Sequence, residues 1–230
     1  MKNRTNRTLT LAALVFTIVA SAQSVRANLL VDPGFEVNQL DTAYNVLNFF
    51  STYQGIWGVE AATISGVDNG VTPFQGVQML RMVDDGLTAT QGFQVTDVSS
   101  YATLIDSGGA TVNLSALFNV DKAVPAAISA VYVQFFTGPS YGSQIGSPLS
   151  GGLTLDISPN TWQTASLSGA IPAGTRWLLS QVLYNDASLM GIDGLSHPGY
   201  VDAANLTITP EPAGLGVLAL TALALWKRWR

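Results

Sequence analysis

The stretch Thr111–Val120, which reads TVNLSALFNV, carries the clearest structural signal in this sequence. Val112, Leu114, Ala116 and Phe118 fall on one face of an extended chain, and threonine, asparagine and serine fill most of the other. A period of two is the pattern of a half-buried β-strand. The stretch therefore predicts a strand that turns one face toward a hydrophobic core.

Similar reasoning extends the strand prediction along the chain. The segment Ile128–Thr137 is β-branched and aromatic with apolar residues on both faces, which favours a central strand. Further strands are predicted at Gln78–Val83, Phe93–Val98, Tyr101–Ile105, Leu153–Ile157, Trp162–Leu167, Trp177–Tyr184 and Tyr200–Ile208. Turn clusters such as Ser107-Gly108-Gly109 separate them, and no helical run interrupts them. This spacing predicts an all-β fold, a jelly-roll β-sandwich.

The predicted sandwich, residues 28–209, has the length of one domain with a substantial core. It contains three basic residues against fourteen acidic ones, a formal net charge of −11. Such a body repels nucleic acid and anionic lipid, so no nucleic-acid partner is expected. The chain has no cysteine and one histidine. Disulfides and thiol catalysis are therefore excluded, and zinc chemistry is strongly disfavoured.

Residues 1–27 have the layout of a secretory signal peptide. Three basic residues precede the apolar run Leu9–Ala20, and small residues follow it. Cleavage after Ala22 or after Ala27 fits the small-residue rule, and Arg26 so close to the second site favours Ala22. The sequence thus predicts a leader helix, export, and a signal peptidase as a processing partner.

Residues 210–230 have a different layout. They read Pro210-Glu211-Pro212, then an apolar run Ala213–Trp226, then Lys227, Arg228, Trp229 and Arg230. The run predicts a short hydrophobic helix of about 21 Å, less than the ~30 Å hydrocarbon core, with its tryptophans at an interface. This suits a transient membrane hold better than a permanent anchor.

This arrangement resembles the PEP-CTERM sorting domain of bacterial exosortase substrates. The resemblance covers only the tail, about a tenth of the chain. It implies a Gram-negative envelope, processing by an exosortase-type membrane enzyme, and delivery to the cell surface or an exopolysaccharide matrix. The resemblance concerns where the protein is sorted and implies nothing about the activity of the domain.

A second resemblance spans the predicted sandwich. The opening stretch Asn28–Glu36 (NLLVDPGFE), the passage Ile171–Thr175 (IPAGT) and the closing stretch Tyr200–Leu206 (YVDAANL) are similar to galactose-binding-like jelly rolls, the fold of many carbohydrate-binding modules. The resemblance implies a structural calcium near the two chain ends, with Glu36 and Asp202 at the matching positions. Ala203 departs from the family pattern at a polar position. The alternative is that Asp202 caps a loop or accepts backbone hydrogen bonds near the start of its strand.

Sugar binding requires exposed aromatic faces with polar neighbours. The candidates are Tyr53, Trp57, Phe74, Trp177 and Tyr184, whereas Trp162 is interpreted as a core residue. Tyr53 and Trp57 are preferred because they lie in a glycine-rich stretch. The competing interpretation is that they fill the core, as aromatic residues in sandwiches mostly do.

A catalytic alternative comes from Gly138-Pro139-Ser140-Tyr141-Gly142, which matches G-x-S-x-G. Asp186 or Asp193, and then His197, follow in the order of an α/β-hydrolase triad. A nucleophile elbow needs a helix after the serine, and the glycines and proline that follow Ser140 do not predict one.

Taken together, these features predict an exported, non-catalytic surface or matrix protein that binds polysaccharide. The alternatives are a secreted serine hydrolase that uses Ser140 and His197, and a purely structural surface protein.

Overall fold

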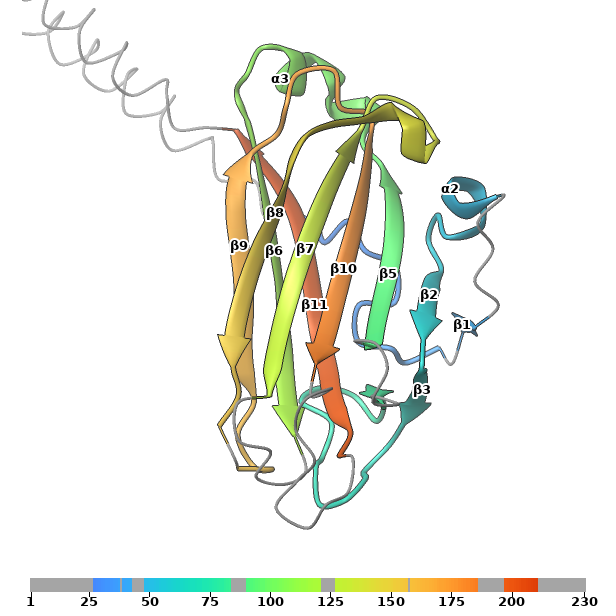
Figure 1. Ribbon diagram of the computed structural model, residues 1–230, viewed down its shortest axis with the longest axis vertical. Coiled ribbons are helices and arrows are strands. Elements are labelled where there is room, and N and C mark those ends of the chain that lie inside the picture. The colour runs from blue at the N-terminus through green and yellow to red at the C-terminus, as the bar shows by residue number, and fades with distance from the viewer. Residues whose placement is uncertain are drawn as a thin grey trace, which may run out of the picture.

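The computed structural model describes residues 27–37, 39–42, 48–83, 90–120, 127–156, 158–185 and 197–210. Within these ranges the strands form two sheets packed face to face (Figure 1). One sheet has the order β1 (Leu40–Asp41), β2 (Trp57–Glu60), β5 (Thr90–Asp97), β10 (Trp177–Asn185), β7 (Ile128–Phe136) and β8 (Gln144–Thr154). The other has the order β3 (Ala62–Ser65), β4 (Met79–Met82), β11 (Gly199–Pro210), β6 (Ala110–Val120) and β9 (Gln163–Ala170). The consecutive strands β5, β6 and β7 alternate between the two sheets, and so do β8, β9, β10 and β11. The expected jelly-roll sandwich is therefore confirmed.

Strand β6 lies in the middle of its sheet between β11 and β9. Val112, Leu114, Ala116 and Phe118 are buried in the core between the sheets, and the alternate residues are half-buried. The period-two prediction for this strand is confirmed. The predicted strands at Ile128–Thr137, Trp177–Tyr184 and Tyr200–Ile208 likewise correspond to β7, β10 and β11.

The strand predicted at Tyr101–Ile105 is wrong. A 3-10 turn, Ser99–Tyr101, and a short helix, α3 (Ala102–Asp106), occupy this segment. The carboxylate of Asp97 accepts the Ser99 N–H at 2.8 Å, which favours a turn at this point. Gly108, with φ of 74°, ends the helix as its N–H donates to the Ile105 carbonyl at 2.9 Å.

Strand β8 begins well before the predicted segment Leu153–Ile157 and ends at Thr154. Its glycines and Pro148 conceal it in the sequence. The strand lies at the edge of its sheet, and its register with β7 shifts between Val133 and Phe135. An edge position and a bulge are the two places where a sheet tolerates proline, since the missing N–H is not needed there.

The two ends of the sandwich are joined by β11. It starts at Gly199, beside Met82 and Val120, and ends at Pro210, beside Ala110. Ala110 follows α3, so β11 ends near α3 and begins at the opposite end of the molecule (Figure 1). The N-terminal segment lies along β11, where Leu29 N donates to the Leu206 carbonyl at 2.9 Å.

The expected leader and tail lie almost wholly outside the described residues. These include the cleavage residue Ala22, Glu211 and Pro212 of the sorting motif, and the terminal residues Trp226, Lys227, Arg228, Trp229 and Arg230. Ala27 is the first described residue and is exposed, and Pro210 is the last. Among the described residues, no helix has the length and apolarity needed to cross a membrane.

Candidate functional site

A hollow of about 240 Å³ opens at the end of the sandwich away from α3. It lies between the β3–β4 connection and the β8–β9 connection, and its lining residues are Gly70, Thr72, Pro73, Phe74, Pro159, Asn160 and Trp162. The rings of Phe74 and Trp162 face each other edge to face, with centroids 6.3 Å apart and planes at 68°. Phe74 is 56% exposed. The hollow thus combines two aromatic rings with uncharged polar groups.

Trp162 is anchored at the back of the hollow. Its indole Nε1 donates to the Thr72 carbonyl at 3.1 Å, and its ring packs against the buried cluster of Val71, Met79 and Tyr200. The sequence interpretation of Trp162 as a core residue is therefore only partly right, since the side chain is half-buried. One part of the ring belongs to the core and another lines the hollow.

The segment 66–73 is held in place by Asp68. Its carboxylate accepts from Arg81 Nε at 2.8 Å and from the Tyr200 hydroxyl at 2.9 Å. The backbones of Asp68 and Val71 exchange two hydrogen bonds of 3.0 and 2.8 Å, which close a tight turn over Asn69 and Gly70. These contacts fix the rim before any ligand arrives, and such preorganisation lowers the entropic cost of binding.

Glu36 and Asp202, the two expected calcium ligands, both hold the adjacent segment 74–78. Asp202 is buried, and its oxygens accept from Ala203 N at 2.6 Å and Gln75 N at 3.0 Å. The Glu36 carboxylate accepts the Val77 N–H at 3.1 Å. Burial raises the pKa of Asp202 to about 6, and the nearby Glu36 charge adds to the rise. Asp202 thus accepts backbone hydrogen bonds near the start of its strand, as the alternative interpretation expected, and these bonds leave the calcium expectation untested.

The donor set around these carboxylates suits a hard cation in part. Neither residue takes part in the ion pairs recorded among the described residues, and the backbone carbonyls of Phe35 and Glu36 lie close by, within 3.1 Å of the Gln78 carboxamide. Calcium prefers oxygen ligands, and its charge would neutralise a buried carboxylate that forms no ion pair. Among the described residues, however, no three His, Cys, Asp or Glu side chains gather in one group.

The expected exposure of Tyr53 and Trp57 is wrong. Tyr53 has no exposed surface and Trp57 is 2% exposed. The short helix α2 (Phe49–Thr52) folds over the six-stranded sheet, and Tyr53 packs edge to face on Phe93 with centroids 4.8 Å apart. Trp57 lies in β2 and packs against Phe35, with ring centroids 5.0 Å apart and ring planes at 44°. Neither ring presents a face to a ligand.

The other aromatic candidates differ in accessibility. Tyr184 is buried, whereas Phe74 is exposed. Trp177 is half-buried and packs against the cluster at α2, which consists of Phe49, Phe50, Tyr53, Phe93, Val95, Phe136 and Leu179. Sequence reasoning included Phe74 without preferring it and assigned Trp162 to the core. The two residues lie far apart in the chain, and no local pattern pairs them. The available signal was their position next to glycine- and proline-containing turns, where binding residues are concentrated.

A row of amides crosses the middle of the six-stranded sheet. Gln91 donates to Glu60 at 2.7 Å, Gln181 donates to Gln91 at 2.7 Å, and Gln134 donates to Gln181 at 3.1 Å. The row therefore joins β2, β5, β10 and β7 through side chains. The side chains of this row hydrogen-bond to one another. The row is therefore a second polar surface, with which the hollow can be compared.

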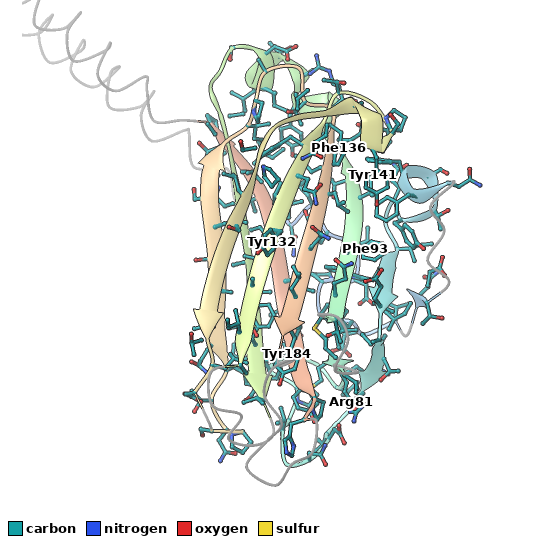
Figure 2. The ribbon with its side chains drawn as sticks, in the orientation of Figure 1. Arg81, Phe93, Tyr132, Phe136, Tyr141 and Tyr184 are labelled. Carbon is teal, nitrogen blue, oxygen red and sulfur yellow. The ribbon has the colours of Figure 1, made fainter. Side chains whose placement is uncertain are left out.

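The structure does not bring Ser140 and His197 together. Ser140 follows β7 and lies near Tyr141 at the α2 end, whereas the His197 carbonyl accepts from the Tyr184 hydroxyl at 3.2 Å. Figure 2 shows Tyr141 and Tyr184 toward opposite ends of the sheet. The register pairs Phe136 with Trp177, and Tyr184 lies seven positions farther along β10, a distance of roughly 23 Å. The residues after Ser140 form a 3-10 turn, so a nucleophile elbow is absent from this part of the described chain.

Comparisons with known proteins find similarity only among solved structures. No family model matches this chain, and no curated protein matches it. The structure of TmCBM61 in complex with beta-1,4-galactotriose matches with a TM-score of 0.49 and 15% identity, covering 80% of this chain and 99% of that one.

Two further solved structures have similar values. The structure titled Family 16 Carbohydrate Binding Module-2 matches with a TM-score of 0.47 and 14% identity, covering 78% of this chain and 99% of that one. A putative sugar binding protein from Bacteroides thetaiotaomicron VPI-5482 matches with a TM-score of 0.49 and 11% identity, covering 79% and 99%. At these identities the matches do not assign this chain to a family.

Proposed function

We propose that this protein is a non-catalytic carbohydrate-binding protein and that its ligand site is the hollow lined by Phe74 and Trp162. The observation that carries the proposal is an exposed aromatic ring that packs edge to face on a second, anchored ring, so that both line a preformed hollow. The C–H face of a pyranose packs on such a ring, and its hydroxyl groups need polar neighbours. Thr72, Asn160 and the backbone around Gly70 supply them.

The lining also limits the class of sugar. None of the residues that line the hollow is charged. A neutral polysaccharide is therefore favoured over a uronic-acid or sulfated one, because an anionic sugar would find no cation in the lining and would approach an acidic body.

A glycan array probed with the full-length protein in mild detergent tests the proposal. The array includes beta-1,4-galactotriose and other neutral oligosaccharides. We expect Phe74→Ala to weaken binding by about ten-fold or more, since one stacking surface is lost. Tyr141→Ala is the matched control, because Tyr141 is a 39% exposed aromatic residue at the α2 end.

Two results would contradict this assignment. If the wild-type protein bound no glycan, the purely structural alternative would replace it. If Phe74→Ala and Tyr141→Ala bound as the wild type does, the ligand site would lie elsewhere, and Gln181→Ala would test the amide row.

We further propose that the protein is exported and sorted to the cell surface or an exopolysaccharide matrix. The leader and the Pro210–Pro212 tail in the sequence support this, with signal peptidase and an exosortase-type enzyme as partners. Fractionation of cells that produce the protein with Glu211→Ala tests it. Retention in the membrane fraction is expected, and unchanged release would overturn the role of the motif.

A structural calcium is the remaining proposal. Glu36 and Asp202 would hold the ion, and its positive charge would offset the negative charge of the buried Asp202 carboxylate. Thermal unfolding of the full-length protein with calcium and with a chelator tests it. A calcium-dependent rise in the melting temperature that Glu36→Gln abolishes is expected. Equal melting temperatures in both conditions would exclude the ion.

A further inference from the structure

The segment 74–78 contains Phe74 and is held almost entirely through its backbone. Asp202 accepts the Gln75 N–H at 3.0 Å. The Glu36 carboxylate accepts the Val77 N–H at 3.1 Å and the Gln78 N–H at 3.3 Å. Three N–H groups of the four consecutive residues 75–78 therefore point at two carboxylates. Hydrogen bonds to a charged acceptor are stronger than those between neutral groups.

Gly76, the remaining residue of the segment, shows how closely the loop fits the carboxylate. Its φ is 63°, a left-handed conformation that favours glycine. A Cβ atom at this position would collide with the Glu36 carboxylate. The loop thus wraps tightly around Glu36, with no room for a side chain between them.

Both carboxylates are fixed by their own surroundings. Asp202 lies at a bulge of β11, where the register with β6 shifts between Asp202 and Asn205 and Ala203 has a φ of 51°. The backbone of Glu36 donates to Asp32 Oδ1 at 2.7 Å, and Ala204 N donates to the Pro33 carbonyl at 2.9 Å. The first and last described segments of the domain therefore meet at this loop.

We infer that Glu36 and Asp202 are positioning residues for the hollow, acting through the backbone of residues 74–78 to hold Phe74 opposite Trp162. This inference rests on the proposed sugar site. Phe74 itself is mostly exposed and has few contacts to hold it. Its place is set by the loop, whereas Trp162 is set by its own core contacts.

Hydrogen exchange of the full-length protein, followed by mass spectrometry, tests the anchoring half of the inference. Glu36→Ala removes the acceptor, and Glu36→Gln keeps a neutral oxygen in nearly the same place. Exchange at Val77 and Gln78 is expected to rise about ten-fold or more in Glu36→Ala and to recover partly in Glu36→Gln. Exchange in the segment 66–73 stays unchanged, because Asp68 holds it independently. Glu60→Ala, which alters a carboxylate on the other sheet, is the matched control.

Binding to beta-1,4-galactotriose, or to the array glycan that the wild type binds best, tests the second half. Affinity is expected to fall in the order wild type, Glu36→Gln, Glu36→Ala, with Glu60→Ala equal to wild type. Faster exchange with unchanged affinity would overturn the positioning role, and unchanged exchange would overturn the anchor. A wild-type protein that binds no sugar overturns the proposed function instead, and the exchange result still decides the anchor.

Discussion

The two ends of this sandwich use aromatic residues in opposite ways. At the α2 end, Phe49, Phe50, Tyr53, Phe93 and Phe136 are all at most 4% exposed. At the other end, the exposed ring of Phe74 and the half-buried ring of Trp162 line a hollow. The difference arises from what covers the rings. The helix α2 covers the rings at the first end. At the second end, the β3–β4 and β8–β9 connections line the hollow and leave the Phe74 ring exposed.

This contrast suggests that the aromatic residues at the α2 end stabilise the fold, whereas those at the other end are available for the proposed ligand. Within the α2 cluster, the centroids of Phe49 and Tyr53 lie 4.9 Å apart, one helical turn from each other, and both rings pack on Phe93. Such contacts contribute to folding and leave no surface for a ligand. The Phe74 ring contributes little burial, and its exposed surface is open to the ligand that we propose.

The largest effect is expected from Phe93→Ala at the sealed end. The ring is 1% exposed and its removal leaves a cavity beneath Tyr53. The free energy of unfolding should fall by about 3–5 kcal/mol. Urea unfolding measures this loss. A change below about 1 kcal/mol would show that the cluster collapses to fill the space and is not tightly packed.

A smaller effect concerns pH at the hollow end. Since the native pKa of Asp202 is about 6 and the unfolded value is 3.8, the native state takes up its proton first on acidification. The stabilisation from this group is therefore present at low pH and is lost as the pH rises through 6, by about 1–2 kcal/mol after allowance for solvent screening. Urea unfolding at several pH values, in a chelator, should show a smaller loss between pH 4.5 and 7 in Asp202→Asn than in the wild type. Identical pH dependence in the two proteins would contradict the shift.

Phe74→Ala sharpens the comparison from the other side. The ring is 56% exposed, so the free energy of unfolding should change by less than about 0.5 kcal/mol. Unfolding by urea and glycan binding should be measured on the same preparation. A loss of stability comparable to that of Phe93→Ala would show that Phe74 is a packing residue after all.

The smallest effect is expected at the α3 end, with the opposite pH dependence to Asp202. A hydrogen bond from Arg176, at 2.6 Å to Asp106 Oδ2, lowers the pKa of Asp106, and the Gly174 N–H adds to the effect. The stabilisation is present at neutral pH and is lost on acidification through the lowered pKa. Asp106→Asn should lower the thermal midpoint slightly at pH 7 and leave it unchanged in strong acid. A larger decrease in acid than at pH 7 would contradict this assignment.

The sequence predicted the strands that have a regular local pattern. The alternation in β6 and the β-branched run in β7 identify strands by themselves, because burial of one or both faces sets the residue choice. Most of the edge strand β8, before Leu153, escaped prediction because Pro148 and the glycines of the strand are typical turn residues. The β2 and β3 strands escaped because their neighbouring glycines suggested an exposed loop.

The proposed binding site was less predictable for a physical reason. Whether an aromatic residue is exposed depends on what folds over it, and α2 covers Tyr53 through contacts with β5 and β7. The pairing of Phe74 with Trp162 likewise depends on two separate loops meeting in space. Asp202 was identified from the sequence as a residue near the two ends of the domain, but its backbone partner Gln75 was not.

The course of β11 would also set the orientation of the protein on a surface, if its tail is held there as we propose. Its twelve residues extend for about 40 Å, from the hollow end to Pro210, and the chain continues from there. A membrane or cell wall that holds the chain beyond Pro210 would therefore meet the α3 end, and the Phe74–Trp162 hollow would face outward, toward the surrounding matrix.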